Sequence, residues 1–396
     1  MYTTVAMNQY IHREAEQRLR AWLKLKKVLL LLGARQVGKT TLLKTFFKTY
    51  KTTYLNLDTE VDKQSFFRAT PLDPNSAMVA LGSPEILIID EAQRFPQVSR
   101  IVKSWFDAEV TTKVILSGSS SLDILDHSAE SLTGRNIKLY LPPLVFSEIV
   151  SAQSWYNFKL GKKSLVGFSE QLNSLLLINL AFGNYPEAVT TEDKPLYLNN
   201  LVSDYLLKDI LQSSLIKTPE LIRRLLLLLA HQTGSIVSVN ELANSLNISR
   251  VTVTRYLDLL ERTFVIFRLP SFSTNPRKEI AKNQKIFFWD TGVRNTLVGE
   301  LNASPLRSDI GKIWENWVIA EFAKKNLLEG NLGRLYFWRS RIGSEVDLLV
   351  KNIVSGKIKA YEIKWSPAKA RVKAFTNMYR IPVDVINREN FTSFLI

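Results

Sequence analysis

The chain has 396 residues, which exceeds the usual size of one hydrophobic core and predicts two or three domains. Hydrophobic residues make up 46% of the sequence and cysteine is absent, so the chain is globular and has no disulfides, cysteine zinc sites or iron–sulfur clusters. The formal net charge of +15 favours a polyanionic partner, with nucleic acid ahead of a membrane surface, although basic surfaces also occur without one.

The first twenty residues mix acidic and basic side chains and lack the apolar run of a signal peptide. The most apolar stretches, residues 28–32 and 225–230, are far shorter than the roughly 18 residues that cross a bilayer. We therefore expect a cytoplasmic protein with no membrane span.

Residues 28–32 form a short apolar run, which is typical of a fully buried parallel strand. A Gly-x₄-Gly-Lys-Thr pattern follows at residues 33–40, and apolar side chains at helical spacing follow that pattern in residues 42–47. A glycine-rich turn between a strand and a helix is the context of a phosphate-binding loop, so the sequence predicts binding of ATP or GTP.

The residue types of this loop explain the expected chemistry. Glycines let backbone amides curl around the β-phosphate, and the start of the helix adds partial positive charge. Lys39 is expected to reach the β- and γ-phosphates, and Thr40 to supply a hydroxyl to Mg²⁺. The predicted cofactors are therefore ATP and Mg²⁺. The predicted nucleotide-binding residues are Gly33, Ala34, Arg35, Gln36, Val37, Gly38, Lys39, Thr40 and Thr41.

A second apolar strand ends in two acids about fifty residues later, at residues 85–91. Asp90 is expected to hold Mg²⁺, and Glu91 to orient and deprotonate the attacking water. The alternative is that Asp90 only caps the next helix.

Two further strands are predicted at residues 52–58 and 113–117, which gives an alternating α/β pattern. Small polar residues follow the later strand, and Ser117 and Ser119 are candidates for contacts to the γ-phosphate. They can equally be turn residues.

The motifs GARQVGKTTLL, ILIIDEAQ, VILSGSSS, SLTGR and PLVFSEI together resemble AAA+ ATPases of an archaeal and bacterial group that carries a separate C-terminal domain of unknown function. The resemblance covers nearly the whole chain. It implies a homo-oligomer, with a hexameric ring as one form. It also implies that Arg135 acts as an arginine finger toward a neighbouring subunit, unless Arg135 only pairs with an acid.

The domains implied are an AAA+ core with a parallel sheet at residues 1–150, a helical lid at 151–232, a winged helix at 233–300 and a nuclease-like α/β domain at 301–396. The turn at residues 182–187 resembles a Gly-Tyr-Pro-Glu signature of the family's lid.

Residues 238–260 have the pattern of a helix-turn-helix, and strands at 264–269 and 285–289 flank a basic, wing-like segment. In a DNA reader the exposed side chains of the second helix and the wing contact phosphates or base edges. These candidates are Ser249, Arg250, Thr252, Arg255, Arg277 and Lys278. Such a module can instead bind protein or serve only for packing.

The C-terminal part predicts a helix at residues 310–325, followed by strands at 335–339, 345–350 and 360–364. Asp347 and the Glu362-x-Lys364 pair resemble the PD-(D/E)XK nuclease signature, with Glu315 completing a metal site. The match is partial because no proline precedes Asp347, and these residues can serve packing or nucleic-acid binding without cleavage.

Our leading hypothesis is an ATPase that couples hydrolysis to binding, remodelling or translocation of DNA. The alternatives are a nucleotide-controlled signalling switch that recruits protein partners, and an ATP-regulated nuclease.

Overall fold

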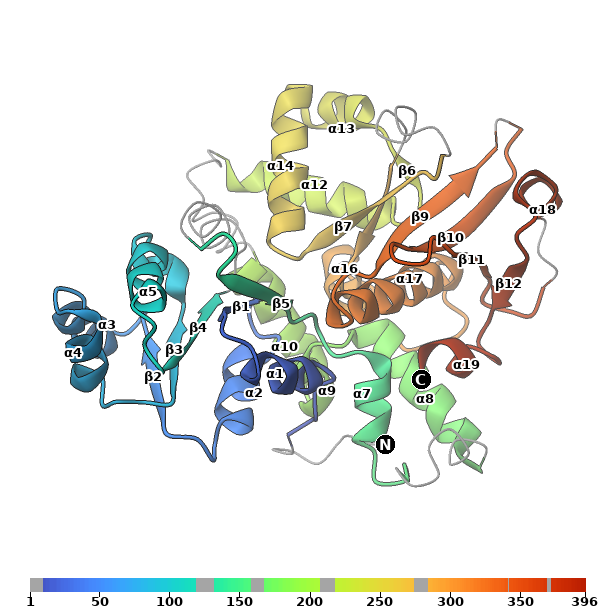
Figure 1. The fold of residues 1–396 in the computed structure, drawn as a ribbon. Helices are drawn as coiled ribbons and strands as arrows, with labels where there is room; N and C mark the ends of the chain where they lie inside the picture. Colours follow the sequence, from blue (N-terminus) through green and yellow to red (C-terminus); the bar gives the residue numbers. More distant parts are fainter. Residues whose placement is uncertain are drawn as a thin grey trace. The chain divides into compact units, whose positions relative to one another are not determined.

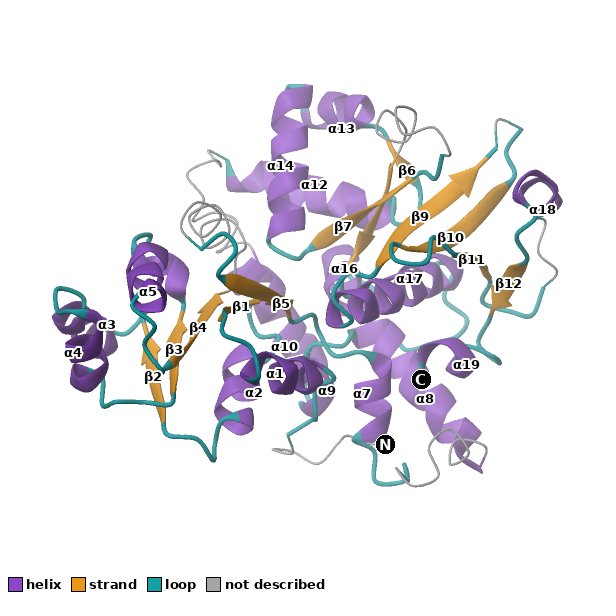
Figure 2. Cartoon of the chain, viewed as in Figure 1, coloured by secondary structure: helices purple, strands orange, loops and turns teal. Residues whose placement is uncertain are grey.

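A computed structural model describes residues 10–118, 132–157, 167–206, 218–273, 284–340, 342–368 and 372–396. The chain divides into two compact units. The N-terminal unit contains residues 12–142 and 262–264, and the C-terminal unit contains residues 143–261 and 265–396 together with the first eleven. Figure 1 follows the elements along the chain, and Figure 2 distinguishes helices from strands.

The N-terminal unit is built on a parallel sheet of five strands in the order β2-β3-β4-β1-β5. The strands are β1 (Val28–Leu32), β2 (Thr52–Asn56), β3 (Ile86–Asp90), β4 (Lys113–Gly118) and β5 (Asn136–Tyr140). The first four confirm the strands predicted from the sequence, and β5 was not predicted. The helices are α1 (Ala15–Leu23), α2 (Lys39–Phe46), α3 (Glu60–Ala69), α4 (Pro74–Ala80), the short η1 (Ala92–Arg94) and α5 (Val98–Asp107).

The central strands are apolar because helices cover the sheet. Every residue of β1 and of β3 is buried, as expected for parallel strands. Leu30, Leu32 and Ile89 share one core with side chains of α3, α4 and α5. This core fixes the strands whose ends carry the predicted motifs.

The C-terminal unit begins with helices and continues into two sheets. Helices occupy most of the described part of residues 151–232, where a helical pattern was expected, and the assignment of this region as a lid stays a prediction. The helices are α7 (Phe146–Ser151), α8 (Ser169–Phe182), α9 (Pro186–Thr190), α10 (Lys194–Asn200), the π-helix η3 (Leu201–Leu206) and α12 (Pro219–His231).

The predicted helix-turn-helix region contains α13 (Val239–Leu246) and α14 (Arg250–Arg262). Asn247 adopts the left-handed conformation in the turn between them. A three-stranded sheet in the order β6-β8-β7 accompanies the two helices. Its strands are β6 (Ile236–Val237), β7 (Ile266–Pro270) and β8 (Gln284–Phe288), and α16 (Thr291–Val298) follows. The elements lie where the sequence predicted them, and their assignment as a winged helix stays a prediction.

The last part forms a four-stranded sheet in the order β12-β11-β10-β9. Strands β9 to β11 are antiparallel neighbours, and β12 pairs parallel to β11. The elements are α17 (Ile310–Leu328), β9 (Gly333–Arg339), β10 (Glu345–Asn352), β11 (Ile358–Ile363), α18 (Lys373–Tyr379), β12 (Val383–Ile386) and α19 (Thr392–Leu395). Within the described ranges, no helix combines the length and apolarity needed to cross a bilayer.

The two sheets of the C-terminal unit meet just after β7. Ser271 bridges to Phe337 of β9, and the Phe272 amide donates to the Phe337 carbonyl at 2.7 Å. Phe272 then enters the core of the four-stranded sheet beside Tyr336 and Trp338. The segment after β7 therefore contributes to the core of the four-stranded sheet.

A buried carboxylate joins the start of this unit to its longest helix. Glu321 and Lys324 of α17 are essentially inaccessible and pair at 3.0 Å. Glu321 also accepts hydrogen bonds from the Phe146 amide at 2.7 Å and from the Asn184 side chain at 3.2 Å. The Asn184 amide donates to the Asp290 carboxylate at 2.6 Å, and Gly183 fits beside it because a Cβ there would lie 1.9 Å from that carboxylate. The PLVFSEI and Gly-Asn-Tyr-Pro motifs thus have a structural role in the C-terminal unit.

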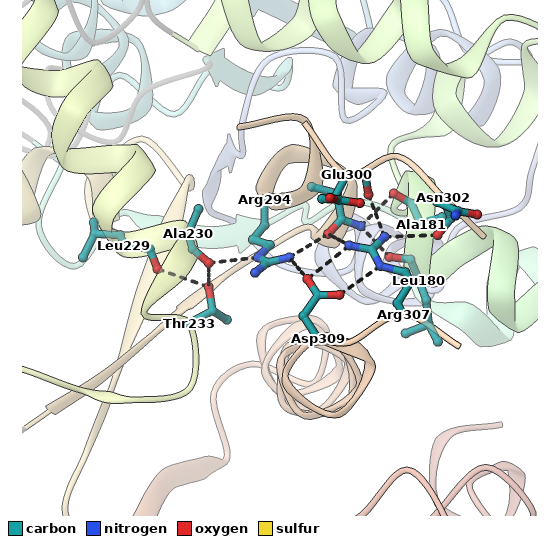
Figure 3. A network of polar contacts seen from close by, with 11 residues as sticks. Leu180, Ala181, Leu229, Ala230, Thr233, Arg294, Glu300, Asn302, Arg307 and Asp309 are labelled. Carbon is teal, nitrogen blue, oxygen red and sulfur yellow. Dashed lines mark hydrogen bonds and ion pairs between the residues drawn. The ribbon is translucent and has the colours of Figure 1, made fainter. Parts of the chain in front are cut away.

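A second polar network, drawn in Figure 3, centres on Asp309. Its carboxylate pairs with Arg294 at 2.6 Å and with Arg307 at 3.0 Å. Arg294 also donates to the Ala230 carbonyl at 2.9 Å, which connects α16 to the end of α12. Burial alone would raise the pKa of Asp309, but hydrogen bonds from Arg307 and Arg294 outweigh it and lower the pKa.

We expect Glu321→Ala to lower the free energy of unfolding of the C-terminal unit by about 3–5 kcal/mol, because it leaves the Lys324 charge buried and unpaired. The matched control is Glu329→Ala, which removes an exposed acid at the end of the same helix. Urea unfolding monitored by circular dichroism measures both. Equal midpoints for the two variants would contradict a structural role for Glu321.

Candidate active site

The predicted phosphate-binding loop connects β1 to α2 and needs its two glycines for different reasons. A Cβ at Gly33 would lie 2.2 Å from the Leu141 carbonyl oxygen, so no larger residue fits. Gly38 has φ of 91°, in the left-handed region that favours glycine, and directly precedes α2. The loop therefore has the close packing and the turn that the sequence pattern predicts.

Two cations hold this loop. The Lys39 ammonium is buried and donates to the carbonyls of Gly33 and Ala34, each at 2.9 Å. Arg13 is also buried and donates to the carbonyls of Val37 at 2.8 Å and Pro142 at 2.7 Å. Their charges favour an anion at the loop. Arg13 was not predicted, because it lies far from the motif in sequence.

The other candidate residues of the loop differ in exposure. Ala34 and Val37 are buried and belong to the packing of the loop. Arg35, Gln36 and Thr40 are partly exposed, and Thr41 is exposed. Gln36 has φ of 61°, a left-handed conformation that is uncommon outside glycine.

Asp90 faces the loop from the end of β3. The Thr40 hydroxyl donates to Asp90 Oδ2 at 2.7 Å, the Tyr54 hydroxyl donates to the same oxygen, and the Glu91 amide donates to Oδ1 at 3.0 Å. Burial by itself would raise the pKa of Asp90, but hydrogen bonds from Tyr54 and Thr40, the nearby Ser117 hydroxyl and the charge of Lys39 lower it overall. Asp90 is thus an ionised group directed at Thr40, which favours the metal-site hypothesis over a helix cap.

Glu91 follows in a left-handed conformation with φ of 52°. Its carboxylate accepts a hydrogen bond from the Gln93 side chain at 2.5 Å. Burial and the neighbouring Asp90 raise the pKa of Glu91, while Lys39 and Arg35 oppose the shift. A carboxylate with a raised pKa is a stronger base, which suits the predicted removal of a proton from water. Gln93 was not predicted from the sequence.

The remaining catalytic candidates have different positions. Ser117 is buried on β4 and lies close enough to Asp90 to lower its pKa, whereas Ser119 lies outside the described residues. Arg135 precedes β5 and pairs with Asp107 through two contacts of 2.6 and 3.3 Å. Because β5 runs parallel to β1, Arg135 lies at the amino edge of the sheet, opposite the edge that carries the phosphate-binding loop.

The DNA-binding candidates lie on α14 or in the wing. Arg250 and Arg255 are exposed on α14. Thr252 is half-buried, and its hydroxyl contacts that of Ser249 at 2.9 Å, at the start of the helix. Arg277 and Lys278 lie outside the described residues.

The acidic candidates on α17 and on the C-terminal sheet are paired with lysines. Lys285 of β8 is 3% exposed, and its ammonium lies 2.9 Å from Glu315 and 2.5 Å from Glu345. Lys364 lies 2.7 Å from Glu362 and 3.6 Å from Asp347. Burial raises the pKa of Glu315, although Lys285 opposes the shift. Lys285 is the group that sequence reasoning missed here, because it comes from a different sheet.

Among the described side chains, no group of three or more His, Asp or Glu residues is placed to hold a metal ion. One oxygen of Glu362, Oε2, is buried without a hydrogen-bond partner. The metal site of a nuclease therefore stays a prediction, and the ion pairs give the ATP-regulated nuclease no support.

Three family descriptions match consecutive parts of the chain. They are an AAA domain at residues 25–150, a domain of unknown function (DUF8612) at 175–304 and another (DUF4143) at 310–393. The first match confirms the predicted AAA-type ATPase. The nuclease-like nature of the last part remains a prediction.

Similar proteins occur in bacteria and archaea. The protein Rv2008c of Mycobacterium tuberculosis is 30% identical over 362 residues, which cover 89% of this chain and 73% of that protein. The protein MJ1544 of Methanocaldococcus jannaschii is 24% identical over 380 residues, covering 92% and 82%. A solved structure, the Walker-type ATPase PABY2304 of Pyrococcus abyssi, aligns with 17% identity and a TM-score of 0.47 over 74% of this chain and 98% of that one.

We expect Lys285→Met to lower the free energy of unfolding by about 3 kcal/mol at pH 8, because Glu315 and Glu345 lose their shared cation. Because burial raises the pKa of Glu315, the folded state becomes less stable as pH rises through that pKa and the carboxyl ionises. The loss should therefore be smaller at pH 5. Urea unfolding at both pH values measures this, with the exposed Lys359→Met as control. A loss that is larger at pH 5 would contradict the assignment.

Proposed function

Because this chain belongs to the same protein family as Rv2008c and carries an AAA domain, we propose that it hydrolyses ATP with Mg²⁺ and couples hydrolysis to the binding and remodelling of DNA. The observation that carries the ATPase proposal is the 2.7 Å contact between Thr40 and Asp90, beside the buried Lys39. Thr40 and Asp90 are fifty positions apart in sequence. Thr40 belongs to the phosphate-binding loop, and Asp90 to the acidic end of β3 that would bind the metal.

The residues present fit a magnesium ion. Mg²⁺ prefers oxygen ligands, and a hydroxyl and an ionised carboxylate meet at the start of α2. Thr40 and Asp90 would hold the ion, and when bound it neutralises charge on the phosphates. Lys39 would exchange its two carbonyl partners for phosphate oxygens. Glu91 would accept the proton of the attacking water, with Gln93 controlling the direction of its carboxylate.

An oligomer is supported by the position of Arg135. At the amino edge of the sheet this guanidinium cannot serve the loop of its own subunit, but a neighbouring subunit can receive it. The finger would first have to leave Asp107. In a closed ring, hexameric or otherwise, every subunit has a neighbour that can receive its Arg135.

DNA as partner is supported by charge. The net charge of +15 attracts a polyanion, and Arg250 and Arg255 are exposed on the second helix of the helix-turn-helix. A cytoplasmic location accords with such a partner.

A second candidate is a nucleotide-controlled switch that recruits a protein through the same helix. It is favoured by Val251, which is 69% exposed on α14 between the candidate DNA contacts. An exposed apolar side chain there suits a protein surface better than a phosphate backbone. Stimulation of ATP turnover by DNA distinguishes the two candidates.

We expect Lys39→Ala to abolish ATP turnover and Glu91→Gln to lower kcat by about 10²–10⁴ while ATP still binds, because only the proton acceptor is lost. The control is Lys48→Ala, an exposed lysine that follows the same helix. Phosphate release and fluorescent-nucleotide binding measure the two effects. Unchanged turnover in Lys39→Ala would overturn the ATPase proposal.

We expect the double variant Arg250→Ala, Arg255→Ala to weaken duplex DNA binding about tenfold and to make the salt dependence less steep, since each lost phosphate contact reduces the slope of log K against log salt by about 0.9. Fluorescence anisotropy between 50 and 200 mM salt measures it. The control removes two exposed lysines near the β10–β11 turn, Lys357 and Lys359. If both double variants bind DNA equally well, α14 is not the contact surface and the protein-recruiting switch is preferred.

A further inference from the structure

Tyr54 lies on β2, next to the strand that ends at Asp90. The two strands pair in parallel register, with Tyr54 opposite Ile88 and Asn56 opposite Asp90. The side chain is partly exposed, and its hydroxyl donates to Asp90 Oδ2 and lies 3.5 Å from the Thr40 hydroxyl. Tyr54 therefore contacts both side chains that would hold the metal.

These contacts fill the acceptor capacity of one Asp90 oxygen, Oδ2. Each carboxylate oxygen has about two lone-pair sites. Oδ2 receives the hydroxyls of Thr40 and Tyr54, and Oδ1 receives the Glu91 amide. A divalent cation or its bound water that uses Oδ2 must compete with one of the two hydroxyls. Thr40 can keep its proton on Asp90 while offering a lone pair to the metal, so Tyr54 is the group that has to leave.

The Tyr54 ring has a separate anchor. The Lys44 ammonium, on the next turn of α2 after Thr40, lies 4.6 Å from the ring centroid. Replacing the phenol by a phenyl ring keeps this contact and removes only the hydroxyl. The role of the hydroxyl can therefore be separated from the packing of the ring.

We propose that the Tyr54 hydroxyl is a positioning group that closes the metal site by binding Asp90, and that it sets the affinity of the ATPase for its divalent cation. The proposal rests on the proposed Mg²⁺-dependent binding of ATP. Tyr54 acts through Asp90 and Thr40 and takes no part in the chemical step.

The test is Tyr54→Phe, with Mn²⁺ as the probe for the metal. Free Mn²⁺ is followed by electron paramagnetic resonance while it is titrated into the protein with saturating ADP. We expect the variant to bind Mn²⁺ about tenfold more tightly, the factor for one hydrogen bond to a charged group at the low end of its range. ADP affinity in the presence of EDTA should stay unchanged, since nucleotide alone does not need Asp90.

Tyr50→Phe is the matched control, because it removes a hydroxyl from an exposed tyrosine just before β2. Thermal melting of each variant verifies folding. Equal or weaker Mn²⁺ binding by folded Tyr54→Phe would overturn the proposal, and so would a loss of ADP affinity in EDTA. If wild-type protein binds neither ADP nor Mn²⁺, the proposed function itself has failed, which is a different result.

Discussion

Parallel strands end at one edge of their sheet, and the candidate active site depends on this constraint. The loop after β1, Ser117 on β4 and Asp90 at the end of β3 belong to neighbouring strands in the order β3-β4-β1. The apolar core under α3, α4 and α5 holds these strands in register. A hydroxyl and a carboxylate fifty residues apart therefore meet at 2.7 Å, which is close enough to share a metal ion. The same constraint places Arg135 at the opposite edge of the sheet, away from the phosphate-binding loop.

The C-terminal unit is held together by a different means. Buried charged side chains connect segments far apart in sequence: Glu321 accepts hydrogen bonds from Phe146 and Asn184, and Lys285 pairs with Glu315 and Glu345. Breaking such a pair is costly because the remaining charge stays buried. The arrangement favours one packing of α17 against the two sheets. In this arrangement Asn184 of the lid-like motif is engaged in hydrogen bonds, and the acids of the nuclease-like motif are engaged in ion pairs.

The local motifs could be predicted, and the contacts between distant segments could not. Glycine spacing, apolar runs and terminal acids identify β1, β3, Lys39 and Asp90, because each signal lies within a few residues. Strand β5 has only one fully buried residue in five, which gives no apolar run. Arg13, Tyr54 and Lys285 reach their sites from other elements, and their neighbours in sequence contain nothing that indicates the contact.

In the conformation described, each group of the proposed reaction is bound by the protein itself. Lys39 is held by loop carbonyls, Asp90 by Tyr54 and Thr40, Glu91 by Gln93, and Arg135 by Asp107. In the proposed reaction Lys39 leaves the loop carbonyls, Tyr54 leaves Asp90 and Arg135 leaves Asp107, and each of these exchanges uses part of the binding energy of the nucleotide. A partner that binds more tightly to the conformation in which these groups contact the nucleotide would raise turnover. The factor is set by the difference between its affinities for that conformation and for the one described here. A DNA-bound ring and a protein-bound switch can both use this property, because it belongs to the AAA domain and not to the surface that recruits the partner.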